Sequence, residues 1–175
     1  MLSAEDISFT IKPVLRKRTI QKMRLLILML FLTVGSVHAD SVTAPIKLEV
    51  FKSKTCGCCV KWIDQLNEKN FDAVGTNLEQ LSSFKASRGI APKYQSCHTA
   101  ISKEGFVFEG HVPAKYISKF LTKPIADAIG LSVPGMPFGS PGMEVGSRFD
   151  PYEVLVLMKD GSSQVFADVA YPGDQ

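Results

Sequence analysis

The sequence predicts an α/β domain built on one central mixed sheet. Strand-like and helix-like hydrophobic patterns alternate over residues 46–122, and two further strand-like runs follow at residues 152–158 and 164–170. Between them lies a segment rich in glycine, proline and methionine, residues 130–146, which we expect to lack regular structure. The domain should therefore consist of a core, this loop and an added C-terminal β-hairpin.

Strand and helix should alternate in the first half of the domain. Apolar residues occupy alternate positions in Ile46–Phe51, which is typical of a buried strand. The next apolar residues recur at the spacing of one helical face, so we expect a helix over about Cys58–Lys69. A second strand over Phe71–Asn77 and a short helix within Leu78–Gly89 should follow.

A hairpin and a third helix should complete the core. Thr99–Ser102 and Phe106–Glu109 are strand-like and are joined by a short glycine-containing turn. Pro113 suits the first turn of a helix, which should stop before Pro124. The resulting order of elements is that of a thioredoxin-like domain. The two C-terminal strands, joined by a turn at Lys159–Gly161, should add to its sheet.

The N-terminal region has the layout of a secretory signal. A short apolar run, residues 25–34, follows basic residues and precedes small residues at Val37 and Ala39. The run is shorter than the roughly 20 residues that a membrane-spanning helix needs. We expect residues 1–39 to be a signal peptide with an upstream extension. Its removal would leave residues 40–175 as a single periplasmic domain outside the membrane.

Charge and size narrow the possible functions. Residues 1–39 hold six of the 20 Lys and Arg residues and two of the 17 Asp and Glu residues, so 14 basic and 15 acidic residues remain. A near-neutral domain has no basic surplus for nucleic acid, and we expect no such partner. Residues 40–175 are also enough to bury a core without disulfides, so small size does not explain four cysteines.

The cysteines form the main candidate site. Cys56, Cys58 and Cys59 lie within four residues, at the predicted start of a helix whose dipole favours thiolates, and Cys97 is the fourth. Thiolates select Cu(I) and also suit Zn(II), but zinc ribbons use paired Cys-x-x-Cys spacings and here the second pair is missing. We therefore expect a copper site, with several bridged ions because adjacent cysteines cannot easily face a single ion.

Four other side chains are candidates for the same site. Met136 and Met143 each end a Pro-Gly-Met sequence, and thioether sulfur is a reasonable Cu(I) ligand but a poor zinc ligand. His98 follows Cys97 directly, and His111 ends the predicted hairpin. Either imidazole could bind the metal or orient its ligands.

Two other functions are compatible with the sequence. Cys56-x-x-Cys59 is a redox motif, in which Cys56 would attack and Cys59 would resolve the mixed disulfide of a thiol-disulfide oxidoreductase. Cys58 and Cys97 argue against this, because they offer competing thiols. Alternatively, the cysteines brace the fold, with Cys97 in a disulfide to the cluster, while the loop over residues 130–146 binds a partner.

Three segments, KTCGCCVKW, YQSCHTAISKEGFVFEGHVPA and VPGMPFGSPGME, together resemble the periplasmic copper-resistance proteins of the CopG family. The resemblance extends over about residues 46–170. It implies a thioredoxin-like domain that holds copper as a multinuclear, sulfur-bridged Cu(I) cluster at the four cysteines. It also implies a role in copper tolerance beside other periplasmic copper-handling proteins, and it is compatible with copper redox activity.

Overall fold

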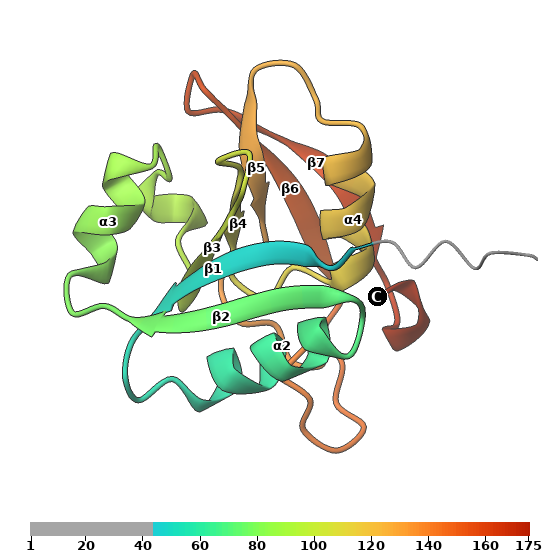
Figure 1. Cartoon of the computed structure of the whole chain (residues 1–175). Helices are drawn as coiled ribbons and strands as arrows, with labels where there is room; N and C mark the ends of the chain where they lie inside the picture. Colours follow the sequence, from blue (N-terminus) through green and yellow to red (C-terminus); the bar gives the residue numbers. More distant parts are fainter. Residues whose placement is uncertain (1–43) are drawn as a thin grey trace, which may run out of the picture. The chain divides into compact units, whose positions relative to one another are not determined.

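The structure, a computed structural model, describes residues 44–175 (Figure 1). A single sheet has the strand order β2-β1-β3-β4-β5-β6-β7. Its strands are β1 (Ile46–Lys52), β2 (Phe71–Asn77), β3 (His98–Ser102), β4 (Val107–Glu109), β5 (Ala128–Ser132), β6 (Tyr152–Met158) and β7 (Ser163–Val169). The helices described are α2 (Gly57–Asn67), α3 (Leu81–Ser87) and α4 (Ala114–Thr122), with short 3-10 turns η2 (Pro92–Tyr94) and η3 (Pro172–Asp174).

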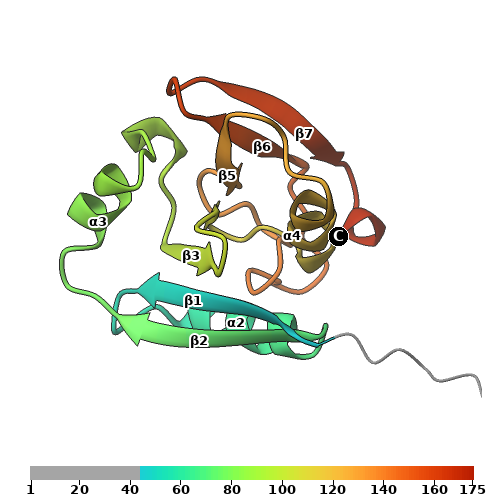
Figure 2. The same cartoon turned by 45° about the horizontal axis from the view of Figure 1, so that its top comes forward.

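The pairing of the first four strands confirms the predicted thioredoxin-like arrangement. β1 and β2 are parallel and are joined through α2, as a strand-helix-strand crossover requires. β3 runs antiparallel to β1, and β4 runs antiparallel to β3. The predicted C-terminal hairpin is also confirmed, since β6 and β7 pair antiparallel and extend the sheet beyond β5 (Figure 2).

Two apolar layers cover the sheet. On one face α2 and α4 contribute Trp62, Ile117 and Phe120 to the main core, which fits the apolar face predicted for α2. On the other face the segment after α3 contributes Ile90 and Tyr94 to a smaller cluster. The sheet is therefore covered on both faces along β3 to β6, whereas β1 and β2 leave alternate residues of their second face exposed.

The segment after α4 differs from the prediction. Residues 130–146 were expected to contain no regular element, but residues 130–132 belong to β5, which pairs parallel to β4. A Cβ at Gly130 would lie only 1.8 Å from the Val107 carbonyl oxygen, so this glycine permits the two backbones to approach. The prediction was wrong because a glycine that allows close strand packing resembles a loop glycine in the sequence.

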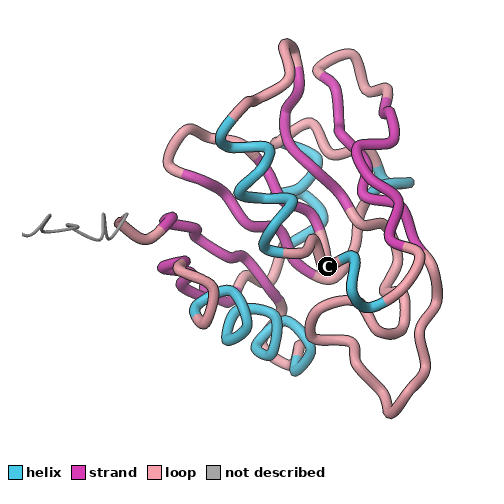
Figure 3. The backbone as a smooth tube through the Cα atoms, turned by 90° about the vertical axis from the view of Figure 1, so that its right-hand side faces the viewer, coloured by secondary structure: helices cyan, strands magenta, loops and turns pink. Residues whose placement is uncertain are grey.

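The remainder of the glycine-rich segment connects β5 to β6 without regular structure and runs past α2 (Figure 3). None of the described helices is both long and apolar enough to cross a bilayer. The predicted signal peptide, residues 1–39, lies outside the described residues.

Candidate metal centre

Three of the four cysteines begin α2. β1 ends at Lys52, and a short loop leads to Cys56, which has extended backbone angles and precedes the first helical residue. Cys58 and Cys59 therefore lie in the first turn, where backbone N–H groups have no helical partner. This is the position predicted from the apolar spacing of the helix, and it favours charged sulfur.

The register of the sheet brings the fourth cysteine to the same place. β3 runs antiparallel to β1, and Lys52 pairs with His98. The last residue of β1 therefore lies opposite the first residue of β3. Cys97, which precedes that residue, reaches the loop that follows β1, and the Cys59 sulfur lies 3.9 Å from the Cys97 carbonyl oxygen.

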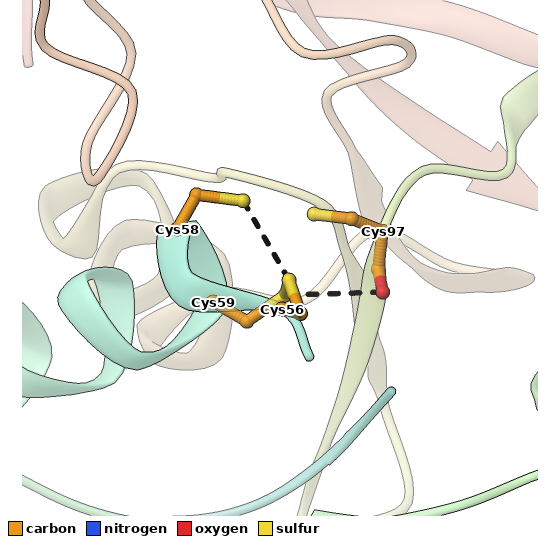
Figure 4. A group of neighbouring side chains, drawn as sticks. All are labelled: Cys56, Cys58, Cys59 and Cys97. Atoms are coloured by element: carbon orange, nitrogen blue, oxygen red, sulfur yellow. Dashed lines mark hydrogen bonds between the residues drawn. A yellow bond between two sulfur atoms is a disulfide. The ribbon is translucent and has the colours of Figure 1, made fainter. Parts of the chain in front are cut away.

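The four sulfur atoms all lie within 4.8 Å of one another. Cys56 and Cys59 form a disulfide, whereas Cys58 and Cys97 are free thiols. The Cys58 sulfur lies 3.6 Å from that of Cys56, and the Cys58 and Cys97 side chains point toward each other (Figure 4). Sequence reasoning left open a disulfide from Cys97 to the cluster, and in this structure the disulfide is within the Cys-x-x-Cys pair instead.

Both candidate histidines contact Cys97. The Cys97 sulfur lies 3.2 Å from His98 Nδ1 and 3.0 Å from His111 Nε2. His111 Nδ1 donates to the Pro141 carbonyl oxygen at 2.7 Å, so in the neutral ring Nε2 is the free acceptor and faces the thiol. Cys97, His98 and His111 form a second group whose ligand atoms are within 4.8 Å of one another. Cys97 is common to both groups.

Burial sets the charge of these groups. It lowers the pKa of His98 well below its usual value, and His111 lowers it further. Burial also lowers the pKa of His111. Both rings are therefore neutral near pH 7 and can offer a nitrogen lone pair. Burial, with a smaller contribution from Cys58, raises the pKa of Cys97 to about 12, so a metal that binds this sulfur must displace a proton.

Both Pro-Gly-Met sequences pass close to this cluster. The Ser96 hydroxyl, beside Cys97, donates to the carbonyl oxygen of Gly135. A Cβ at Gly142 would lie 2.7 Å from the carbonyl oxygen of Cys58, so the second sequence packs directly on the first turn of α2. The residues next to these glycines are Met136, which is 51 % exposed, and Met143, which is half-buried. Ligation by either thioether stays a prediction.

A buried ion pair next to the cluster was missed. Lys85 of α3 and Glu109 at the end of β4 are both buried and bind each other as well as Ser96. Glu109 ends an otherwise apolar strand, and this position in the sequence could have indicated a buried carboxylate with a partner. Nothing in the local sequence distinguishes Lys85 from the other polar residues of α3.

Comparisons with known proteins agree with this geometry. A family described as "Protein of unknown function, DUF411" matches residues 94–143. Two solved structures, "Copper resistance protein copG- Form 1" and "Form 2", are each 39% identical to this chain with a TM-score of 0.67. Each match covers 71% of this chain and 98% of the solved one. Among curated proteins no match was found. The chain belongs to the family of the copper resistance protein CopG.

Proposed function

We propose that this protein binds Cu(I) through the thiolates of Cys56, Cys58, Cys59 and Cys97 and thereby contributes to copper resistance. The observation that carries the proposal is the convergence of four sulfur atoms within 4.8 Å of one another, from two segments 38 residues apart. Soft thiolate ligands favour Cu(I). The solved structures that this chain resembles are named copper resistance proteins.

The bound copper is multinuclear in this proposal. Four thiolates at such short separations can each bridge two ions, whereas one ion needs only two to four ligands. Cys97 belongs both to the sulfur group and to the group with His98 and His111, so its sulfur is suited to join ions held by the two groups. Met136 and Met143 would supply further soft ligands from the loop.

Copper binding then competes with the disulfide. The sulfurs of Cys56 and Cys59 are bonded to each other in this structure, and a disulfide sulfur carries no thiolate charge. Reduction of that bond takes two electrons and two protons from an external dithiol and yields two thiols, which lose their protons when copper binds. The oxidised protein holds less copper, and the reduced protein is the loaded form.

We place the protein in the periplasm. The proposal rests on the signal-like sequence in residues 1–39, and a disulfide at Cys56–Cys59 suits an oxidising compartment. Its partners there would be copper ions and other copper-handling proteins.

One observation favours a second function, thiol-disulfide exchange. The disulfide joins the two ends of a Cys-x-x-Cys motif at the start of a helix in a thioredoxin-like domain. Cys58, 3.6 Å from the Cys56 sulfur, can attack that sulfur, form a Cys56–Cys58 disulfide and release Cys59 as a thiol, or release a substrate bound to Cys56 in the same way. This competing thiol makes exchange the weaker of the two functions.

Metal selectivity tests the proposal. Fully reduced protein should take up Cu(I) in preference to Zn(II) when both are offered under anaerobic conditions, and ultraviolet thiolate-to-copper absorption should appear. Protein whose four thiols have been alkylated beforehand is the control and should bind neither ion at this site. Reduced protein that is indifferent to both metals would contradict the proposal and favour a protein whose cysteines only brace the fold.

A further inference from the structure

Lys85 and Glu109 form an ion pair that is almost fully removed from solvent. Lys85 is 2% exposed and Glu109 is 0% exposed. Lysine and glutamate are rarely buried to this extent unless they are paired, because the loss of hydration is costly. The pair joins α3 to the end of β4, next to the cysteine cluster rather than within the main apolar core.

Both members of the pair bind the backbone of one residue, Ser96. Lys85 Nζ donates to the Ser96 carbonyl oxygen at 2.8 Å, and the Ser96 amide donates to Glu109 Oε1 at 2.6 Å. The Thr99 hydroxyl donates to the other oxygen of Glu109 and fixes the carboxylate. The Ser96 side chain in turn donates to the carbonyl oxygen of Gly135. Ser96 is therefore held through its amide, its carbonyl and its hydroxyl.

Ser96 is the residue directly before Cys97. Both lie between η2 and β3, ahead of the first ladder residue of that strand, His98. The strand ladder therefore does not fix the backbone that carries the Cys97 sulfur. The hydrogen bonds from the ion pair to Ser96 supply that restraint.

Stability alone is a poor explanation for such a pair. Replacing a buried ion pair with apolar residues of similar volume is often neutral or stabilising, because the charges lose their hydration when buried. Charged donors and acceptors do, however, make strong and directional hydrogen bonds to backbone groups. In this protein the two charged side chains fix the position of the Ser96 backbone.

We propose that Lys85 and Glu109 are positioning residues, which hold Cys97 through Ser96 in the place where its sulfur completes the four-sulfur site. The inference rests on the proposed Cu(I) binding and deepens it. Neither side chain touches copper, and both act through the backbone before Cys97. Their removal should weaken copper binding only as long as Cys97 is a ligand.

A double-mutant comparison tests this dependence. Lys85→Met combined with Glu109→Leu removes both charges, so that neither is left buried alone. The same pair of changes is also made in a Cys97→Ser background. Apparent Cu(I) affinity is measured on reduced protein against a competing Cu(I) chelator, together with the thiolate-to-copper absorption spectrum. The matched control is Lys159→Met with Asp127→Asn, which removes an exposed ion pair of the same kinds of charge.

The expected result is a loss of about 10-fold to 100-fold in affinity and an altered spectrum when Cys97 is present, as is typical when groups that orient a ligand are removed. In the Cys97→Ser background the same changes should have little further effect, and the exposed-pair control should bind as the unmodified protein does. If the apolar double variant fails to fold, as judged by circular dichroism, Lys85→Met with Glu109→Gln keeps the side-chain shapes and replaces it.

Equal losses in both backgrounds, or no loss in either, would overturn the positioning role while leaving copper binding intact. If the unmodified protein binds no Cu(I), the proposed function is wrong, and the positioning role is then wrong as well. Cu(I) binding by the unmodified protein therefore distinguishes the two failures.

Discussion

The Nε2 atom of His111 lies 3.0 Å from the sulfur of Cys97, and the opposite nitrogen of the ring donates to the Pro141 carbonyl oxygen. The ring thus links the loop after β5 to the cysteine cluster. Because the Pro141 contact fixes the tautomer, Nε2 of the neutral ring accepts a hydrogen bond from the Cys97 thiol and directs its lone pair toward the cluster. The thiol can donate to Nε2 only while the ring is neutral.

The stability of the oxidised protein should therefore fall as the pH decreases below about 6.5. Burial lowers the pKa of His98 and of His111 in the folded protein, so the unfolded chain binds more protons in this range. Each histidine contributes a slope of at most about 1.4 kcal/mol per pH unit, with stability rising as the pH rises. Denaturant unfolding over about pH 5 to 7 measures the free energy of unfolding.

His111→Gln is the matched variant for this measurement. The free energy of unfolding of this variant should change less steeply with pH than that of the unmodified protein, because one titrating histidine is missing. Glu109, whose pKa burial raises, contributes a slope of the opposite sign in both proteins and cancels in the difference between them. The difference reports His111 together with its smaller effect on the pKa of His98. Identical slopes would show that His111 does not titrate differently in the folded and unfolded states.

A side chain at Gly142 should disturb the first turn of α2. Gly142→Ala would place a Cβ 2.7 Å from the Cys58 carbonyl oxygen, at a positive φ of 85°. We expect a loss of roughly 1–3 kcal/mol beyond the cost of the φ angle itself, together with weaker copper uptake. Gly146→Ala is the control, since its φ is also positive but no atom lies within 4 Å, and it should cost roughly 1 kcal/mol. Equal losses in denaturant unfolding would show that the close packing does not matter.

Copper ligation by the two loop methionines can be tested with substitutions that leave no cavity. Met136→Leu and Met143→Leu together remove the thioethers and nearly conserve volume, so stability should change by less than about 1.5 kcal/mol. If the thioethers bind copper, Cu(I) affinity should fall about tenfold or more, as for the loss of one ligand interaction. Met158→Leu on β6, which packs against the main core, is the control and should leave affinity unchanged. Unchanged affinity in the double variant would remove the methionines from the site.

Cys58→Ser separates the two candidate functions. It keeps the Cys56–Cys59 pair but removes one sulfur of the cluster, so copper loading should fall more than the rate of insulin disulfide reduction. If copper binding is the function, the loss should exceed about tenfold in Cu(I) affinity. Both quantities are measured on the same preparation. The reverse ranking would make the protein a thiol-disulfide exchanger.

Much of the fold was accessible from the sequence because its local signals agree with the final packing. The apolar spacing of α2 predicted both the helix and the placement of three cysteines at its start. β5 was missed because Gly130 is needed for close strand approach, and that requirement depends on Val107, 23 residues earlier. A tertiary contact of this kind has no local sequence signal.

The composition of the candidate site could also be proposed from the sequence, but its geometry could not. The positions of His98 and His111 around Cys97 follow from the β1–β3 register and from the loop carbonyl at Pro141. The hydrogen bonds of Lys85 and Glu109 to Ser96 join α3, β4 and the loop before β3, which meet only in the folded chain. These contacts join residues far apart in the sequence, so no local sequence pattern predicts them.

The number of copper ions bound per chain decides whether the four sulfur atoms hold a cluster. Reduced protein is loaded with excess Cu(I) under anaerobic conditions, freed of unbound metal, and analysed for copper and protein by elemental analysis. We expect more than one copper ion per chain, held by thiolates that each bridge two ions. A ceiling of one ion would contradict the cluster, and retention of no copper would contradict the proposed function itself.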